Sequence, residues 1–128
     1  MTYQETGSEK YNSIPVVDIE TIEMLKHHAG GNLEILSDLF DSFFPEAEEQ
    51  INELFEAVDN NDKEKFLKSA HGLSGITATI GATQLKTLAV DMEKLAKAGN
   101  FDEAYKLLDN INVLYEQFVE KAKELINS

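Results

Sequence analysis

Hydrophobic residues recur every three or four positions along most of the chain, and no segment alternates hydrophobic and polar residues over the length of a strand. This spacing is typical of helices that bury one face. Shorter stripes of the same period predict helices over residues 19–29, 61–81, 83–98 and from 100 to the end. The longest stripe follows Asn32 and consists of Leu36, Phe40, Phe43, Ala47, Ile51, Leu54 and Val58.

Residues that favour helix ends separate these stripes. Asp18, Asn32 and Asn61 precede the first three predicted helices, and each can accept a hydrogen bond from a free backbone N–H of the first turn. Pro45 lies inside the second stripe and is expected to kink or divide that helix. Glycines follow three of the stripes and favour helix termination, at Gly30, Gly31, Gly81 and Gly99.

Four long amphipathic helices joined by short connections predict an all-α fold, an antiparallel up-down-up-down four-helix bundle. The short extra helix near the N-terminus is expected to lie on this bundle as a lid. Residues 1–13 are polar and without periodicity, which predicts a flexible N-terminal tail. Residues 14–128 then form one domain, and a monomer is expected because a bundle of this length buries its own stripes.

The composition excludes several classes of function. The net charge is −13, which argues against a nucleic-acid surface or an anionic membrane surface as partner. All 11 basic residues are lysines, and there is no cysteine, so the chain offers no arginine clamp, disulfide or thiolate metal site. The polar N-terminal residues lack the apolar segment of a signal peptide, and we expect a cytoplasmic protein.

One histidine lies among unusually small neighbours. Residues three, four and seven positions after His71 share its face of the helix, and they are Ser74, Gly75 and Ala78. Glycine inside a helix costs about 1 kcal/mol relative to alanine. Because the buried stripe passes through Ala70, His71 is rotated by about 100° from it, onto the flank or the outer face. This arrangement indicates an imidazole that something large must reach.

Several roles for such a histidine are weighed against each other. It has no second histidine at zinc-binding spacing, so no metal site is predicted. A Ser74–His71 nucleophile pair lacks an orienting carboxylate in the local sequence. The imidazole itself is a nucleophile when neutral, and a phosphoryl group on it favours small neighbours and a nearby cation. Lys68, one turn before His71, supplies such a cation.

The stretch resembles the signature of histidine-containing phosphotransfer (HPt) domains of multistep phosphorelays. The similarity covers about residues 14–126 and includes 40–44 and 57–62 upstream of the histidine. The residues in register with the signature are Ala70, His71, Leu73, Gly75, Gly81, Ala82, Leu85, Leu88 and Glu93.

The resemblance implies a four-helix bundle that accepts a phosphoryl group on His71 from one receiver-domain aspartate and passes it to another. Response-regulator receiver domains and a (hybrid) sensor histidine kinase are then the expected partners. The sequence has no GxxxxGK[ST] loop, so no ATP-dependent kinase activity is expected. No cofactor is expected on this chain, and Mg²⁺ is expected on the partner receiver domain.

The chain departs from the family at one position near the histidine, because Ser74 stands where a lysine is usual. Lys68, Ser74, Gly75 and Ala78 are the predicted neighbours of the phosphoryl group, with Lys68 left to supply the charge. Two other hypotheses stay open: an interaction module that docks on receiver domains or a kinase without transfer, and an enzyme with a histidine base or a metal site.

Partner docking requires apolar and charged residues near the histidine. Leu39 and Phe44 lie off the main stripe of the second helix, and Lys86 adds positive charge beyond the third. We predict these three residues as docking positions. The alternative for Leu39 and Phe44 is that Pro45 shifts the helical phase and places both in the core.

Overall fold

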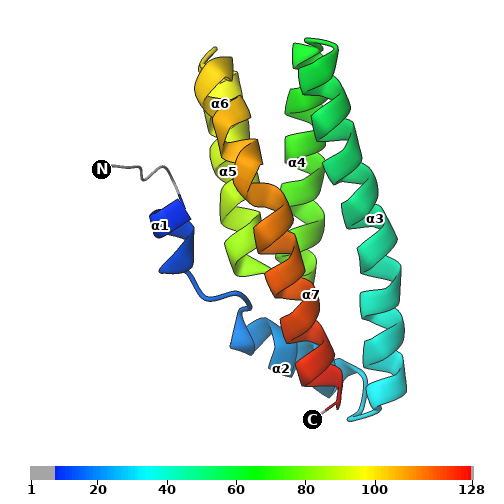
Figure 1. Cartoon of the computed structure of the whole chain (residues 1–128). Coiled ribbons are helices and arrows are strands. Elements are labelled where there is room, and N and C mark those ends of the chain that lie inside the picture. Colours follow the sequence, from blue (N-terminus) through cyan, green and yellow to red (C-terminus); the bar gives the residue numbers. More distant parts are fainter. Residues whose placement is uncertain (1–7, 128) are drawn as a thin grey trace.

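The computed structural model describes residues 8–127, which are helical apart from short connections. Figure 1 shows the long helices packed side by side, and residues 8–127 contain no strand, so the all-α bundle fold is confirmed. The helices are α1 (Ser8–Asn12), α2 (Ile19–His28), α3 (Leu33–Asp59), α4 (Lys63–Ile80), α5 (Thr83–Lys97), α6 (Phe101–Leu107) and α7 (Ile111–Asn127), with a 3₁₀ turn at Leu108–Asn110.

The helix starts follow from side-chain caps. Asp18 accepts a hydrogen bond from the Glu20 N–H at 3.2 Å, and Asn32 accepts one from the Glu34 N–H at 2.9 Å, as the sequence predicts. The predicted cap at Asn61 is wrong, because Asp62 caps α4. Asn61 instead adopts a left-handed φ of 53° in the turn, a conformation that asparagine tolerates better than most residues.

Two predicted boundaries differ from the structure. Pro45 does not divide α3, which is continuous from Leu33 to Asp59. Pro45 is exposed, so the carbonyl that loses its helical partner lies on the solvent side. The predicted last helix is instead broken between α6 and α7, where Leu108 and Ile111 are both buried and keep the hydrophobic stripe continuous across the 3₁₀ turn.

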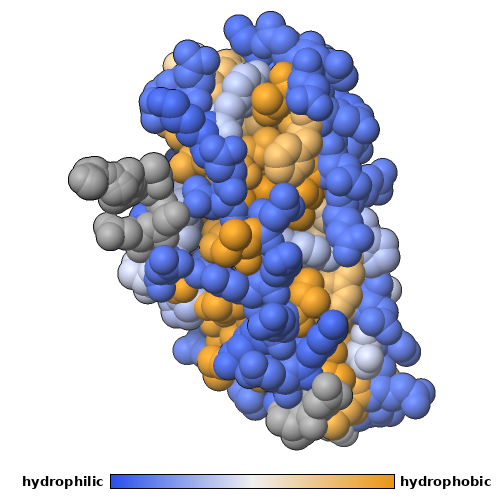
Figure 2. Space-filling view, viewed as in Figure 1, coloured by the Kyte–Doolittle hydropathy of each residue, from blue (hydrophilic) through white to orange (hydrophobic). Residues whose placement is uncertain are grey.

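Aromatic rings form much of the core between the long helices. Phe118 of α7 lies edge-on to Phe43 of α3 with ring centroids 5.3 Å apart, and 6.0 Å from Phe40. Phe66 of α4 packs edge-on against Tyr105 of α6 at 5.0 Å. Figure 2 shows hydrophilic residues over the outer flanks, with hydrophobic residues gathered in the seam between the helices on this face. The stripes therefore bury against one another as the spacing predicts.

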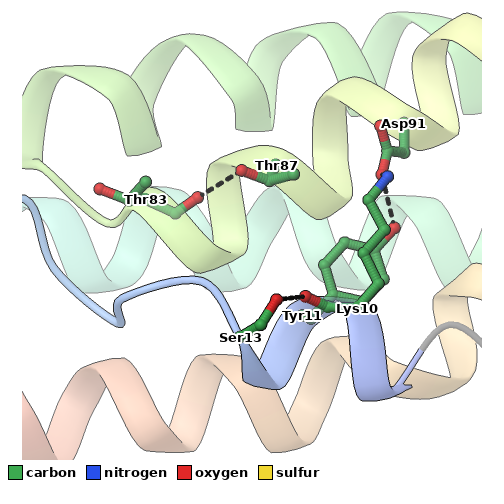
Figure 3. A network of polar contacts seen from close by, with 6 residues as sticks. All are labelled: Lys10, Tyr11, Ser13, Thr83, Thr87 and Asp91. Atoms are coloured by element: carbon green, nitrogen blue, oxygen red, sulfur yellow. Dashed lines mark hydrogen bonds and ion pairs between the residues drawn. The ribbon is translucent and has the colours of Figure 1, made fainter.

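The N-terminal segment corrects the prediction of a flexible tail. Residues 1–7 lie outside the described residues, but 8–12 form α1, and Tyr11 is only 1% exposed. The Tyr11 hydroxyl donates to Asp91 of α5 at 2.7 Å, and Lys10 pairs with the same carboxylate at 2.6 Å (Figure 3). Gln84 of α5 donates to the Tyr11 carbonyl at 2.8 Å. These contacts, 73 to 81 residues apart in sequence, attach α1 to α5.

Because the pKa of the Tyr11 hydroxyl is raised, we expect the protein to lose stability at high pH. Burial, followed by the hydrogen bond to Asp91 and its charge, raises the pKa of Tyr11 well above the ordinary 10.0. Stabilisation from this group is therefore complete below pH 10 and is lost as the pH rises above it, by at most about 1.4 kcal/mol per pH unit. In urea titrations between pH 8 and 11.5, Tyr11→Phe is expected to lose about 1 kcal/mol at pH 8 and to show a shallower decline.

Tyr105→Phe is the matched control for this prediction, because the Tyr105 hydroxyl is buried without a hydrogen-bond partner in the described part of the chain. Its removal is expected to leave the stability at pH 8 almost unchanged. An equal loss in both variants would mean that the Tyr11–Asp91 hydrogen bond does not stabilise the protein.

Candidate functional site

The exposed histidine of the sequence analysis lies on the outer face of α4. The His71 side chain is 75% exposed, whereas its neighbours Ala70 and Leu73 are fully buried. The helical phase therefore predicts its orientation correctly. Because α4 packs against both α3 and α5, the histidine stands on a helix that is fixed on two sides.

A carboxylate from α5 holds the imidazole. His71 Nδ1 lies 2.8 Å from Glu93 Oε2, and Lys97 Nζ lies 3.2 Å from the same oxygen. Burial by itself raises the pKa of the Glu93 carboxyl, but the hydrogen bonds from His71 and Lys97 outweigh it and hold that pKa below its usual range. Glu93 is therefore ionised at neutral pH.

This contact determines which ring nitrogen is reactive. An ionised carboxylate only accepts hydrogen bonds, so Nδ1 carries the proton that bridges to Glu93. In the neutral ring, Nε2 then keeps its lone pair. The exposed end of the side chain is thus a nitrogen nucleophile, and its orientation is fixed by a charge-assisted hydrogen bond.

The small residues after His71 leave this face open. A Cβ added at Gly75 meets no atom within 4 Å, and Ala78 is exposed. The Ser74 hydroxyl donates to the His71 carbonyl at 2.8 Å, so it is turned back onto its own helix. The proximity of these residues to a phosphoryl group stays a prediction, but the approach that they were expected to leave clear is open.

Lys68 lies one turn before His71 on α4, whereas the small residues follow it. It is exposed, lines a groove between α3 and α4 together with His71, and makes no ion pair within residues 8–127. The expected cation is therefore on the same helix face as the nucleophile.

The three predicted docking residues lie in different environments. Phe44 is half-buried against the core, with its ring centroid 6.3 Å from that of Phe40 and 6.5 Å from that of Phe118. This environment agrees with the alternative that Phe44 packs in the core. Leu39 is 36% exposed in a shallow hollow between α3 and α4. Lys86 is exposed and lines a hollow beside Ala78. Docking through Leu39 and Lys86 stays a prediction.

Glu93 is in register with the family signature, but its role did not follow from the sequence. Glu93 is 22 residues from His71, and the contact depends on how α5 lies against α4. The signal available in the sequence was the register of Glu93 with the family signature. No group of three His, Cys, Asp or Glu side chains suited to a metal ion exists within the described part of the chain.

The fold and the site together define a helical bundle with an exposed histidine on α4 that is oriented by a carboxylate of α5. The Hpt domain model matches residues 38–127, and the chain therefore belongs to the Hpt domain family. Members of this family carry phosphoryl groups on a histidine in two-component signalling, where they act with receiver domains and histidine kinases.

Similar proteins are known from plants and bacteria. "Histidine-containing phosphotransfer protein 2" of Arabidopsis thaliana is 24% identical over 114 residues, 87% of this chain and 73% of the relative. The solved structures of HptB from Pseudomonas aeruginosa and ZmHP2 from maize each give a TM-score of 0.75, at 21% and 22% identity. They cover 89% and 93% of this chain, and 96% and 94% of their own, which supports the shared fold.

No helix between residues 8 and 127 is both long enough and apolar enough to cross a membrane.

Proposed function

We propose that this protein is a phosphorelay intermediate in which His71 accepts a phosphoryl group from an aspartyl phosphate of one receiver domain and passes it to a second receiver domain. The observation that carries the proposal is the exposed imidazole whose Nδ1 is held by Glu93 at 2.8 Å. We further propose that the protein acts as a cytoplasmic monomer without kinase activity of its own.

The proposed step requires little from this chain beyond positioning. The Nε2 lone pair attacks the phosphorus, an N–P bond forms, and the bond from phosphorus to the aspartate oxygen breaks and leaves a carboxylate on the receiver. The ring then carries a proton on Nδ1 and a phosphoryl group on Nε2, and its positive charge is balanced by Glu93. Attack by an aspartate of the second receiver reverses these bond changes.

The remaining parts of the reaction are assigned to the partner. Phosphoryl transfer depends mainly on alignment and on charges around a loose transition state. We propose that the receiver domain holds Mg²⁺, whose charge would offset that of the phosphoryl oxygens during transfer. The open space at Gly75 suits the approach of a second globular domain.

The test is to mix the full chain with magnesium-loaded, phosphorylated receiver domains from several pathways. The phosphorylated residue is then mapped by mass spectrometry at neutral pH. A base-stable, acid-labile phosphoryl group on His71 supports the proposal. Measurable binding without transfer from any receiver favours the docking module instead, and Ser74→Lys is then the first variant to assay.

Loss of the Glu93 carboxylate is expected to slow the transfer. In Glu93→Ala, nothing fixes the proton on Nδ1, so part of the neutral imidazole moves to the tautomer protonated on Nε2, which has no lone pair at the reacting position. We expect the rate constant for transfer to fall about fivefold. Nitrogen-15 NMR of His71 is expected to show the change of tautomer directly.

Glu103→Ala is the control, since Glu103 is an exposed acid paired with Lys106 of the same helix.

The pH dependence of stability gives an independent readout of the role of Glu93. Because the pKa of Glu93 is held below its usual 4.5, its stabilisation is complete above pH 4.5 and is lost as the pH falls through the lowered value. Glu93→Ala removes this part of the acid-side decline, and an unchanged tautomer and rate in this variant contradict the role given to Glu93.

A further inference from the structure

A groove of about 700 Å³ runs along the α3 side of His71. It is lined by His71, Gly72 and Lys68 of α4 and by Gln50 of α3. Gln50 lies close to the α4 backbone: a Cβ placed on Gly72 is 3.2 Å from Gln50 Cδ and Oε1 and 3.3 Å from Nε2. The absence of a side chain at residue 72 therefore lets the Gln50 amide pack against the α4 backbone at the residue that follows His71.

The geometry of imidazole directs the reactive nitrogen to this side. The two ring nitrogens are separated by a single carbon, and their outward directions diverge widely, so a ring with Nδ1 facing α5 turns Nε2 outward and away from α5. The groove lined by Gln50 lies on that other side of α4. A phosphoryl group on Nε2 is thus carried away from Glu93, and His71 also lines the groove on the α3 side.

The Gln50 amide is available for a ligand. It is half-buried and makes no hydrogen bond among the contacts of residues 8–127, although glutamine side chains have two N–H donors. An amide donor of this kind, positioned by packing against Gly72, is suited to a phosphoryl oxygen.

Among the charged side chains that line the groove, one lysine is free to bind the phosphoryl oxygens as well. Glu53, Asp62 and Glu64 also line it and oppose an anion. The Lys65 ammonium is already paired, because its Nζ lies 2.6 Å from Glu56 Oε1 and 3.9 Å from Glu53 Oε1. The Asp62 carboxylate is also engaged, since it accepts a hydrogen bond from the Lys65 backbone N–H at the start of α4. Lys68 is the remaining basic residue of the groove without an ion pair within the described part.

We propose that Gln50 and Lys68 bind the phosphoryl oxygens of phosphorylated His71, so that the α3–α4 groove does the work of the lysine that Ser74 replaces. This inference rests on the proposed function for the identity of the phosphorylated residue. It assigns Gln50 as a residue that contacts the transferred group, a role that the sequence pattern alone did not indicate.

The test uses a small phosphodonor, so that no receiver domain is needed. The Nε2 lone pair of His71 is expected to attack the phosphorus of phosphoramidate, whose P–N bond then breaks with release of ammonia. The rate constant is measured on the full chain by mass spectrometry. Gln50→Glu places a negative charge where the amide was and is expected to lower the rate about fivefold. Asn52→Asp makes the same change of charge on an exposed face of α3 and is expected to stay within about twofold.

A second variant displaces the Gln50 amide without changing Gln50 itself. In Gly72→Ala the new Cβ requires the Gln50 amide to move, and alanine strengthens the helix, so the fold is retained. We expect a rate reduced about threefold. In the wild type, the Gln50 side-chain N–H signals are expected to shift on phosphorylation, whereas those of Asn52 stay in place.

The outcomes separate the two proposals. Equal rates for Gln50→Glu and Asn52→Asp, or unshifted Gln50 signals in phosphorylated protein, overturn the groove assignment even if receivers transfer to His71. Slowed reaction with phosphoramidate together with failed transfer from every receiver supports the groove and overturns the relay.

Discussion

His71→Gln is expected to abolish phosphoryl transfer, with a rate at least about a thousandfold below that of the wild type. The amide nitrogen of glutamine has no nucleophilic lone pair, so no N–P bond forms at this position. The side chain is 75% exposed and makes its one side-chain hydrogen bond to Glu93, to which a glutamine amide also donates. The free energy of unfolding is therefore expected to change by no more than about 1 kcal/mol.

The experiment compares transfer and receiver binding in the same samples. His27→Gln is the matched control, because His27 is an exposed histidine on α2 that undergoes the same change of side chain. We expect full transfer in His27→Gln, and unchanged receiver binding in both variants. Phosphoryl transfer that persists in His71→Gln contradicts the assignment and directs the search to His27 or His28.

The position of His71 follows from the sequence because it depends only on the phase of one helix. The stripe through Ala70 and Leu73 fixes which face of α4 is buried, and His71 is rotated away from it. The side chains that lie near the histidine cannot be predicted from the phase of one helix. Glu93 and Gln50 come from different helices, and their contacts depend on the register of α5 and α3 against α4. That register results from the packing of all the stripes together.

The N-terminal error has a related cause. Residues 8–13 contain one large hydrophobic side chain, Tyr11, which is too little to show a period. Its burial depends on Asp91 and Gln84, more than 70 residues away. The choice between Asn61 and Asp62 as cap was equally hidden, because both residues suit a cap and only the backbone of the turn decides between them.

Phe118→Ala is expected to cost about 3–5 kcal/mol of unfolding free energy, the largest effect on stability that we predict. Phe118 is 1% exposed and its ring lies within 6.5 Å of three phenylalanine rings of α3. Removing it leaves a cavity between α7 and α3, and both the lost apolar contacts and the unfilled space destabilise the fold. Urea titration followed by circular dichroism measures this loss.

Val113→Ala is the control on the same helix, because Val113 is 57% exposed and its truncation is expected to change the unfolding free energy by less than about 0.5 kcal/mol. A loss below about 1 kcal/mol in Phe118→Ala contradicts the close packing of α7 against α3.

The transfer rate of Phe118→Ala gives a further readout in conditions where the variant is still folded. His71 and its partners lie on α3, α4 and α5, so folded Phe118→Ala is expected to transfer at close to the wild-type rate. A large drop in that rate would show that the position of α3, and with it the groove beside His71, depends on the aromatic contacts with α7.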